Sequence, residues 1–374
     1  MISLSVADID YPPPREVQEA VEEWLREERT PYGHYQGEPE LRRALAAKVR
    51  AVNGIPVSED DILVIPGTMF AIFLACYLCL RSGDEAILTP APVYGPFWKN
   101  VMAAGATPVP HDLVMETGFP YARDPLSGLI TPCTRLLMLC NPHNPTGRVL
   151  KPEELETIAQ TALDQDLMIF SDELYEDMIF EGEHRSIASL GEEVFQRTLT
   201  VFGFSKALGI PGYRVAYMVI PPGLRTRVVE ATQRILVHTD ILAQAAAMGA
   251  LRAIGPWVEA FMRHLRQMRD RSLERIQRIP RLVCSRPEAT PFLFPDVRSF
   301  GLTSHDLAKH LLEKAKVVVQ PGNHFGPSGE GFVRINLATS WEILSEAFDR
   351  MERALGELPQ HQGVGGRGQG QEGT

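Results

Sequence analysis

A lysine in a glycine-rich segment is the residue of this chain best suited to covalent chemistry. Lys206 lies in Gly203-Phe-Ser-Lys-Ala-Leu-Gly-Ile-Pro-Gly-Tyr-Arg214, directly after the β-type run of residues 198–202. A lysine partly removed from water loses some preference for its charged form, and its amine can then attack a carbonyl. Arg214 has the fork geometry that holds a phosphate. A Ser-Lys pair in a loop is by itself more often a surface lysine, so its interpretation depends on the rest of the chain.

Polar clusters also follow other short apolar runs, which alternate with helical segments. This alternation predicts an α/β fold with a mostly parallel, doubly wound sheet and a smaller α+β unit. The carboxyl ends of such strands share one edge, so the clusters should meet in one crevice, although turns alone also collect Gly, Pro, Asn and Asp. The clusters are Pro66-Gly67-Thr68 after residues 62–65, Pro92-Val-Tyr94 after 85–89, Asn141-Pro-His-Asn144 after 135–140, and Asp172-Glu-Leu-Tyr175 after 167–170.

These side chains together suit a flat, phosphorylated aldehyde cofactor. Lys206 would form a Schiff base with it, and Asp172 would keep a ring nitrogen protonated, a pairing that offsets the cost of burying a carboxylate. Such a cofactor is an electron sink that stabilises a carbanion next to an amino-acid nitrogen. The other expected contacts are Tyr175 and Asn144 to the ring hydroxyl, Tyr94 stacked on the ring, and Arg214 with the helix N-terminal amides of Gly67, Thr68 and Met69 to the phosphate.

The motifs resemble, in order, those of fold-type I pyridoxal-phosphate enzymes. The closest likeness is to the class I and II aminotransferases and to their relatives, the cystathionine β-lyase-like C–S lyases. It covers about residues 5–356 and rests on Asn141-Pro-x-Asn-Pro-Thr-Gly147, Asp172-Glu-x-Tyr and Ser-Lys206 followed by Gly-Tyr-Arg. It implies that Lys206 is the Schiff-base lysine and proton carrier and that Asp172 pairs with the pyridine nitrogen. It assigns Tyr175, Asn144, Tyr94, Ser205 and Arg214 to the cofactor, and Arg334, in Phe-Val-Arg-Ile-Asn, with Asn144 and Tyr11 to the substrate.

The resemblance also implies a homodimer whose active sites are shared across the interface. Tyr32, in Tyr-Gly-His-Tyr-Gln-Gly, matches the tyrosine that reaches the phosphate of the neighbouring subunit, and Tyr35 competes for this role. Gly203 stands where many relatives have a phosphate-binding serine, so phosphate binding is expected to rely more on Thr68 and Arg214.

Two reactions remain open on these motifs. Lys206 removes the α-proton in both; returning it to the cofactor carbon gives transamination, and loss of a group from Cβ gives elimination. Val6-Ala-Asp-Ile-Asp-Tyr-Pro and His143 resemble the lyase branch, whereas Thr146 and Tyr175 resemble aminotransferases. We interpret His143 as a turn residue exposed at the edge of the pocket.

We expect an aminotransferase that acts on an L-amino acid and a 2-oxo acid. A C–S β-lyase is the alternative, and a cyclase or decarboxylating variant is a further one. A non-catalytic regulator is disfavoured because Lys206 and Asp172 are both present. The substrate side chain stays open among acidic, aromatic and aliphatic amino acids.

Composition limits the partners and the compartment. Hydrophobic residues make up 44% of the 374 residues, charged residues 22%, and the net charge is −10, which argues against nucleic-acid and anionic-membrane partners. We expect no signal peptide. The five scattered cysteines indicate a reducing compartment, and we expect the cytoplasm. Cys76-Tyr-Leu-Cys79 lies in an apolar helical run without a second Cys/His pair, so no metal site is predicted.

The chain divides into four expected parts. Residues 1–31 form a segment that joins the small domain, 32–255 the large cofactor-binding domain, and 256–357 the small C-terminal domain. A long helical segment after Pro221 is expected to stop at a Gly255-Pro256 break, with a separate helix over residues 256–280. Residues 358–374, rich in Gly and Gln, are expected to be disordered.

Overall fold

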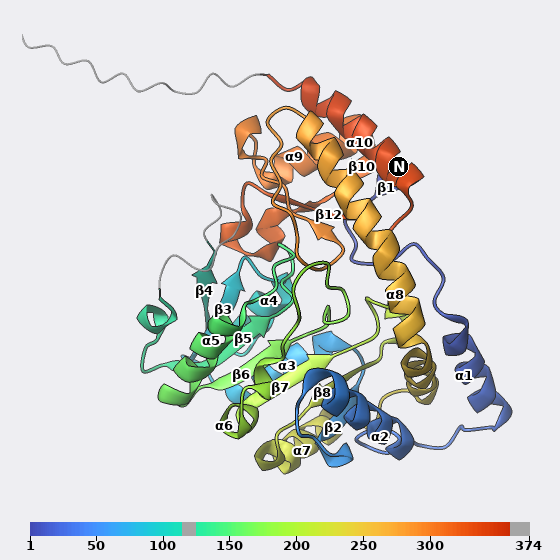
Figure 1. The fold of residues 1–374 in the computed structure, drawn as a ribbon. Helices are drawn as coiled ribbons and strands as arrows, with labels where there is room; N and C mark the ends of the chain where they lie inside the picture. Colours follow the sequence, from blue (N-terminus) through green and yellow to red (C-terminus); the bar gives the residue numbers. More distant parts are fainter. Residues whose placement is uncertain (114–124, 360–374) are drawn as a thin grey trace, which may run out of the picture.

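A seven-stranded sheet forms the centre of the larger part of the molecule (Figure 1). The computed structural model describes residues 1–113 and 125–359, so the predicted tail lies outside the described residues from 360 onward. Only β8 runs antiparallel to its neighbours, which confirms the mostly parallel sheet. In spatial order the strands are β2 (Ile62–Ile65), β8 (Ala216–Val219), β7 (Thr198–Phe202), β6 (Met168–Asp172), β5 (Thr134–Cys140), β3 (Glu85–Ala91) and β4 (Thr107–Asp112).

Helices cover both faces of this sheet, which explains why its strands read as continuous apolar runs. One face packs against α3 (Thr68–Cys79), α4 (Gly95–Ala103) and α7 (Arg225–Ile235). The other packs against α5 (Pro152–Asp164), with α6 (Glu192–Phe195) beside it. Cys76 is buried in α3 among apolar neighbours, as expected of a structural cysteine. The short strand β8 follows the lysine segment and was not among the predicted strands.

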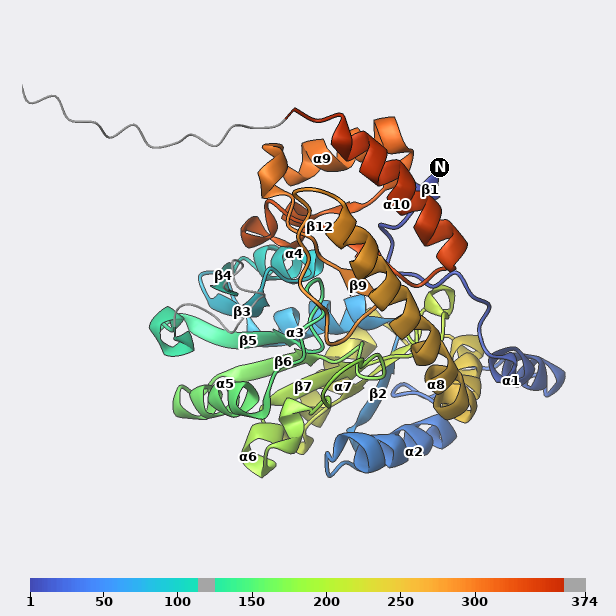
Figure 2. The same ribbon diagram turned by 45° about the horizontal axis from the view of Figure 1, so that its top comes forward.

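The smaller part stands at one end of the sheet, at the top of Figures 1 and 2. Its antiparallel sheet has the order β11 (Gln320–Pro321), β12 (Val333–Asn336), β9 (Phe292–Leu293). The N-terminal strand β1 (Ile2–Ser3) pairs in parallel with β10 (Val317–Val318) of this smaller part. The helices of this part are α9 (Ser304–His310) and α10 (Trp341–Gly356).

The helix α8 (Ile241–Arg278) is continuous where the sequence predicted a break. It passes through Pro256, and the interruption lies earlier, between α7 and α8, where the Asp240 carboxylate accepts a hydrogen bond from the amide of Ala243. Buried side chains on both sides of the proline, Ala253 and Phe261, outweigh the local cost of that residue. The proposed domain boundary at 255/256 therefore falls inside a helix.

The same helix holds the N-terminal segment. α1 (Arg15–Arg26) lies against it, and a Cβ added at Gly249 would be 2.3 Å from the carbonyl oxygen of Glu16. Among the described residues α8 is the one helix long and apolar enough to cross a bilayer, but Ala246 and Ala250 are buried in the protein core. Its apolar composition is thus accounted for by packing.

Candidate active site

The polar clusters at the strand ends line one cavity. β2, β5, β6 and β7 all deliver their carboxyl ends to this edge of the sheet, because β8 reverses direction between β7 and β2. Residues that the sequence reasoning had not singled out complete the wall, among them Ala7, Cys140 and Val215. The predicted site residues that line the cavity are Gly67, Thr68, Met69, Tyr94, Asn144, Asp172, Tyr175, Ser205, Lys206 and Arg214.

Lys206 is partly buried in the wall of the cavity. Its Nζ donates a 2.5 Å hydrogen bond to the carbonyl oxygen of Ala7. Burial lowers the pKa of Lys206 to about 8, and the positive charges of Arg334 and Arg214 act in the same direction, against the raising effect of Asp8 and Asp172. At pH 7 about a tenth of the amine is therefore uncharged and available as a nucleophile, far more than for a lysine with the ordinary pKa of 10.5. Ala7 belongs to the Val6-Ala-Asp stretch, which resembles the lyase branch but which the sequence alone did not connect with Lys206.

Asp172, the last residue of β6, is a buried carboxyl group at the base of the cavity. Burial raises its pKa to about 7; the amide of Leu174, which donates to its Oδ1 at 3.2 Å, opposes this shift, and the charge of Glu173 adds to it. In residues 1–113 and 125–359 no cationic side chain forms an ion pair with it. A carboxylate in this setting gains most from a cationic partner, such as a protonated ring nitrogen.

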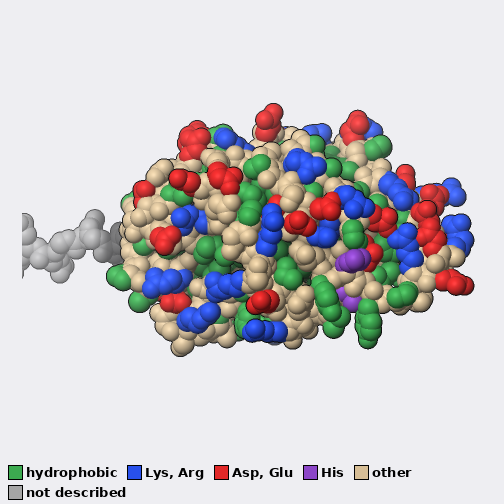
Figure 3. Space-filling view, turned by 90° about the horizontal axis from the view of Figure 1, so that it is seen from below, with side chains coloured by type: hydrophobic (Ala, Val, Ile, Leu, Met, Phe, Trp, Pro, Cys, Tyr) green, Lys and Arg blue, Asp and Glu red, His purple; other side chains and the backbone are tan. Residues whose placement is uncertain are grey.

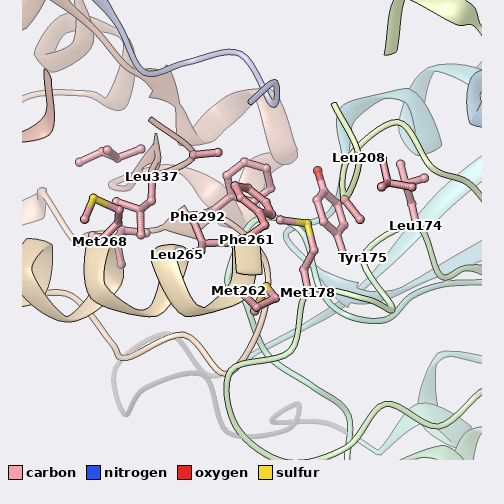
Figure 4. Packing of buried hydrophobic residues seen from close by; sticks show 14 of the residues in the cluster. Leu174, Tyr175, Met178, Leu208, Phe261, Met262, Leu265, Met268, Phe292 and Leu337 are labelled. Carbon is pink, nitrogen blue, oxygen red and sulfur yellow. The ribbon is translucent and has the colours of Figure 1, made fainter. Parts of the chain in front are cut away.

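Two tyrosines flank this carboxyl group. Tyr175 is packed edge-to-face against Phe292 with ring centroids 5.5 Å apart, and burial raises its pKa. Figure 4 shows Tyr175 in the same apolar cluster as Phe292 and, from α8, Phe261. Tyr94 is partly exposed; its hydroxyl lies 3.8 Å from the sulfur of Met69, and burial raises its pKa as well. The Tyr175 ring is thus fixed by the core, whereas Tyr94 forms the outer wall.

Arg334, on β12, reaches the cavity region from the smaller part of the molecule. Its Nη1 donates to Oδ1 of Asn144 at 2.9 Å, and its Nη2 donates to the carbonyl oxygen of Ser5 at 2.8 Å. The guanidinium lies over the ring of Phe292, 4.1 Å from the centroid. Burial lowers the pKa of Arg334 to about 10, and its Nε has no hydrogen-bond partner among residues 1–113 and 125–359. A buried cation with an unused donor is well prepared to bind a carboxylate.

Arg334 lines a second cavity rather than the first. This neighbouring cavity lies between α4 and the segment 320–327, and Tyr94 belongs to both linings. The two cavities therefore meet at the Tyr94 ring, with Lys206 on one side and the Arg334 guanidinium on the other.

The N-terminus of α3 and Arg214 form a cradle suited to an anion. Gly67 precedes the helix with φ +89°, and a Cβ built there would lie 2.5 Å from Nη2 of Arg214. Arg214 itself has φ +54°, and its Nη1 donates to the carbonyl oxygen of Pro211 at 2.9 Å. The amide of Gly67 donates to the carbonyl oxygen of Ile65 at 2.8 Å, so the donors that this cradle offers a phosphate are the amides of Thr68 and Met69 and the Arg214 guanidinium. The donor set and the lack of room for a side chain at position 67 fit the cofactor.

Three predicted residues lie elsewhere in the single chain. Tyr32 is 87% exposed, with its ring edge-to-face against His238, and Tyr35 is also exposed. Tyr11 places its hydroxyl 2.8 Å from Nε2 of His264 and does not line the cavity. These contacts do not by themselves assign any of the three to the site.

The interpretation of His143 as an exposed turn residue is wrong. Its side chain is fully buried, with Nδ1 2.6 Å from the hydroxyl of Thr146 and Nε2 3.1 Å from the carbonyl oxygen of Pro90. Burial lowers the pKa of His143 to about 3, so the ring is neutral. It joins the loop after β5 to the end of β3, a role that a one-dimensional turn pattern does not indicate.

Comparison with known proteins relates nearly the whole chain to aminotransferases. A family model described as aminotransferase class I and II matches residues 1–351. An aspartate aminotransferase of Pyrococcus abyssi is 36% identical over 361 residues, which are 96% of this chain and 92% of that protein. The aromatic-amino-acid aminotransferase 2 of Thermococcus litoralis has the same identity and coverage. The structure of an aromatic aminotransferase from Pyrococcus horikoshii superposes with a TM-score of 0.91 at 35% identity and covers 95% of both chains.

Proposed function

Because the chain belongs to the class I and II aminotransferase family, we propose that Lys206 binds the cofactor aldehyde and carries the proton in its reaction. The protein is a pyridoxal-phosphate-dependent aminotransferase of fold type I, which moves an amino group between an L-amino acid and a 2-oxo acid. One observation supports the residue roles above all others. Lys206, with a pKa lowered to about 8 mainly by burial, and the buried Asp172, which forms no ion pair within the described residues, line the same cavity.

The cofactor, when bound, withdraws electrons from the α-carbon of the substrate. Asp172 would keep a proton on the ring nitrogen of the bound cofactor, and Tyr175 with Asn144 would bind the ring oxygen. The phosphate would be held at the helix N-terminus of residues 67–69, by Ser205 and by Arg214, and the ring would lie against Tyr94. The Lys206 amine, once released from the carbonyl oxygen of Ala7, would accept the α-proton and return it.

Arg334 is assigned to the α-carboxylate of the substrate. Its unpartnered, buried Nε supports this role, and so does its hydrogen bond to Asn144, which ties the carboxylate site to the cofactor site. A carboxylate approaching Arg334 passes the Tyr94 ring, which both cavities share. Tyr11 remains a proposed substrate contact; binding would require its hydroxyl to leave His264.

The amino donors are proposed to be acidic and aromatic L-amino acids. The proposal is supported by the names of the relatives, an aspartate aminotransferase and an aromatic-amino-acid aminotransferase at 36% identity. The test adds each donor to the loaded enzyme with 2-oxoglutarate and measures the new 2-oxo acid against the glutamate formed. If the acidic and the aromatic donors each give the new 2-oxo acid and glutamate in equal amounts, the proposal is supported. Ammonia and pyruvate from a thioether such as cystathionine, without glutamate, would instead assign the protein to the C–S lyases.

We also propose a homodimer that completes the site. Met69, Phe73 and Tyr77 are 40%, 39% and 47% exposed and follow one another at i, i+4 spacing along α3. The rings of Phe73 and Tyr77 stack at 5.9 Å. Because Met69 also lines the cavity, a second copy seated on this stripe would reach the cavity mouth. Such a copy could present Tyr32, which is exposed in the single chain.

No nucleic-acid or membrane partner is proposed. Figure 3 shows basic and acidic side chains interspersed on the face that it presents. A cytoplasmic location is proposed, which the free state of all five cysteines supports. The division into a segment 1–31, a large domain 32–255 and a small domain 256–357 is likewise kept as a proposal, with α8 as the element common to both domains.

A further inference from the structure

The segment 172–177, Asp-Glu-Leu-Tyr-Glu-Asp, has two chemically different sides. Asp172, Leu174 and Tyr175 line the cavity, whereas Glu173, Glu176 and Asp177 do not. Glu173 and Glu176 are 1% and 9% exposed, so their carboxylates lie in the protein interior behind the site. Buried carboxylates are costly unless cations and hydrogen-bond donors meet them. Glu173 and Glu176 therefore each require partners in the interior.

His184 meets the first carboxylate. Its Nε2 lies 2.9 Å from Oε2 of Glu173, whose Oε1 accepts hydrogen bonds from the hydroxyls of Ser171 at 2.7 Å and Ser186 at 2.9 Å. Burial alone would lower the pKa of His184, but the hydrogen bond and charge of Glu173 outweigh it and raise the pKa.

His184 also reaches the loop that follows β5. Its Nδ1 lies 3.5 Å from Nδ2 of Asn141, and the backbone amide of Asn141 donates to the carbonyl oxygen of Asp172 at 3.0 Å. The ring therefore lies between the two neighbouring strand ends that supply Asn144 and Asp172.

Lys48, the last residue of α2 (Pro39–Lys48), meets the second carboxylate. Its Nζ donates to Glu176 Oε1 and, at 3.1 Å, to Oδ1 of Asn53, whose own Nδ2 donates to the other oxygen of Glu176. The ammonium lies 5.0 Å from the ring centroid of Phe202, the last residue of β7 before the lysine segment. Lys48 thus connects α2, the segment 172–177 and the end of β7 from behind the cavity.

We propose that Lys48 and His184 are positioning residues, two interior side chains that bind Glu176 and Glu173, hold segment 172–177 from behind and thereby keep Asp172 and Tyr175 in place for amino transfer. This rests on the roles proposed above for Asp172 and Tyr175. Buried ion pairs are a poor source of stability compared with apolar packing, and one established use is to select a single arrangement. Here the two pairs hold Glu173 and Glu176 of the same segment whose Asp172, Leu174 and Tyr175 line the cavity, so a loss of either pair would loosen the site. A displacement of about 1 Å can cost about a hundredfold in rate.

The test removes one pair without leaving a charge behind. Lys48→Met alone would strand the Glu176 carboxylate and lower stability, so the informative variant is Lys48→Met/Glu176→Gln. We expect its thermal midpoint to stay near that of the wild type while kcat falls about tenfold or more and KM changes by less than about threefold. Glu173→Gln/His184→Gln should behave in the same way.

A second readout does not depend on catalysis. In the cofactor-free protein, amide hydrogen exchange of residues 174–178 should be about tenfold faster in Lys48→Met/Glu176→Gln than in the wild type. The matched control is Arg225→Met/Asp61→Asn, which removes an ion pair of 2.5 Å to a buried carboxylate just before the amino end of β2, the edge of the sheet away from the cavity. This control should leave kcat and the exchange of residues 174–178 unchanged.

Wild-type kcat and wild-type exchange in Lys48→Met/Glu176→Gln would overturn the proposal. An equal loss of kcat in the Arg225 control would also overturn it, because the effect would then be one of general stability. Lys206→Ala is assayed in parallel, so that failure of the proposed function can be distinguished from failure of the positioning role. If Lys206→Ala retains activity, the proposed function fails; if it is inactive and the Lys48 variant is fully active, only the positioning role fails.

Discussion

Asn144 and Arg334 are hydrogen-bonded, Oδ1 to Nη1 at 2.9 Å, although 190 positions separate them in the sequence. Asn144 belongs to the loop after a strand of the large sheet, and Arg334 belongs to a strand of the small one. The bond therefore joins the residue proposed for the cofactor oxygen to the residue proposed for the substrate carboxylate. Substrate binding at Arg334 is in this way connected to the orientation of the cofactor.

Replacing Arg334 tests that connection. Arg334→Ala should lower kcat/KM about a hundredfold or more, mainly through KM, because a charge-assisted pair with the carboxylate is lost. Arg334→Lys should recover little, since an ammonium cannot reproduce the fork that holds both Asn144 and a carboxylate. Steady-state kinetics with an acidic and an aromatic donor measures both effects. An unchanged KM for both donors would reassign Arg334 to a structural role.

Removal of the proposed cofactor lysine should abolish turnover. In Lys206→Ala, no amine is left to bind the aldehyde or to move the α-proton, so transamination should fall by at least about a thousandfold. The visible absorbance of the covalently held cofactor should be absent after gel filtration. Lys309→Ala is the control, since Lys309 is an exposed lysine on α9 and belongs to the lining of neither cavity. A wild-type spectrum in Lys206→Ala would show that another lysine holds the cofactor.

Asp172→Asn separates catalysis from stability. Without the carboxylate the ring nitrogen loses its partner, and kcat should fall about a hundredfold or more. In the cofactor-free protein, the pKa of Asp172 is about 7 because of burial, against an ordinary 3.8, so the folded state binds a proton that the unfolded state has released. Stability should therefore decrease as pH rises from about 4 to about 7, and Asp172→Asn should remove that part of the decrease.

The measurement is the thermal midpoint of both cofactor-free proteins across this pH range. Burial and the charge of Glu176 raise the pKa of Asp177 to about 7 as well, which adds a decrease of the same sign to both proteins. The difference between the two curves isolates Asp172. Superimposable curves would contradict the prediction.

Gly67→Ala should weaken cofactor binding. Its Cβ would meet the Arg214 guanidinium at 2.5 Å, in the cradle proposed for the phosphate, and φ there is +89°. Gly83→Ala is a matched control, because Gly83 has the same φ of +89° with nothing within 4 Å of an added Cβ. Both variants carry the backbone strain, but only Gly67→Ala should raise the Kd of pyridoxal phosphate, by about tenfold or more. Equal affinities in the two variants would argue against this cradle.

The proposed homodimer can be tested at the exposed stripe of α3, Met69, Phe73 and Tyr77. Phe73→Glu places a charge beside Tyr77 in the surface proposed for the second copy and should shift the protein toward monomers in sedimentation velocity. Glu153→Lys, at an exposed position of α5 on the opposite face of the sheet, should leave the assembly unchanged. The shared site predicts in addition that an inactive Lys206→Ala chain and a Tyr32→Phe chain, mixed after unfolding and refolding, regain part of the activity. A monomeric wild-type protein would refute the dimer proposal.

The sequence by itself predicted the strands that end at the cavity, though not the antiparallel β8, and it identified most of the side chains that line the cavity. Asp172 and Lys206 could be identified because each directly follows an apolar run, and in a parallel sheet the ends of such runs must lie at one edge. The prediction of a helix break at Pro256 was wrong. Local propensity favours a break there, but packing of α8 on both sides of the proline maintains the helix.

Tertiary structure decided what the side chains meet. His143 and His184 both lie in polar loops of the sequence, yet their surroundings differ. His143 is neutral and lies against a hydroxyl and a carbonyl oxygen, whereas His184 contacts a buried carboxylate. No spacing rule in the sequence predicts the hydrogen bonds that join Lys206 to Ala7, Lys48 to Glu176 and Arg334 to Asn144. Burial and charge at a site depend on segments that are distant in the chain, and only the folded arrangement of those segments determines them.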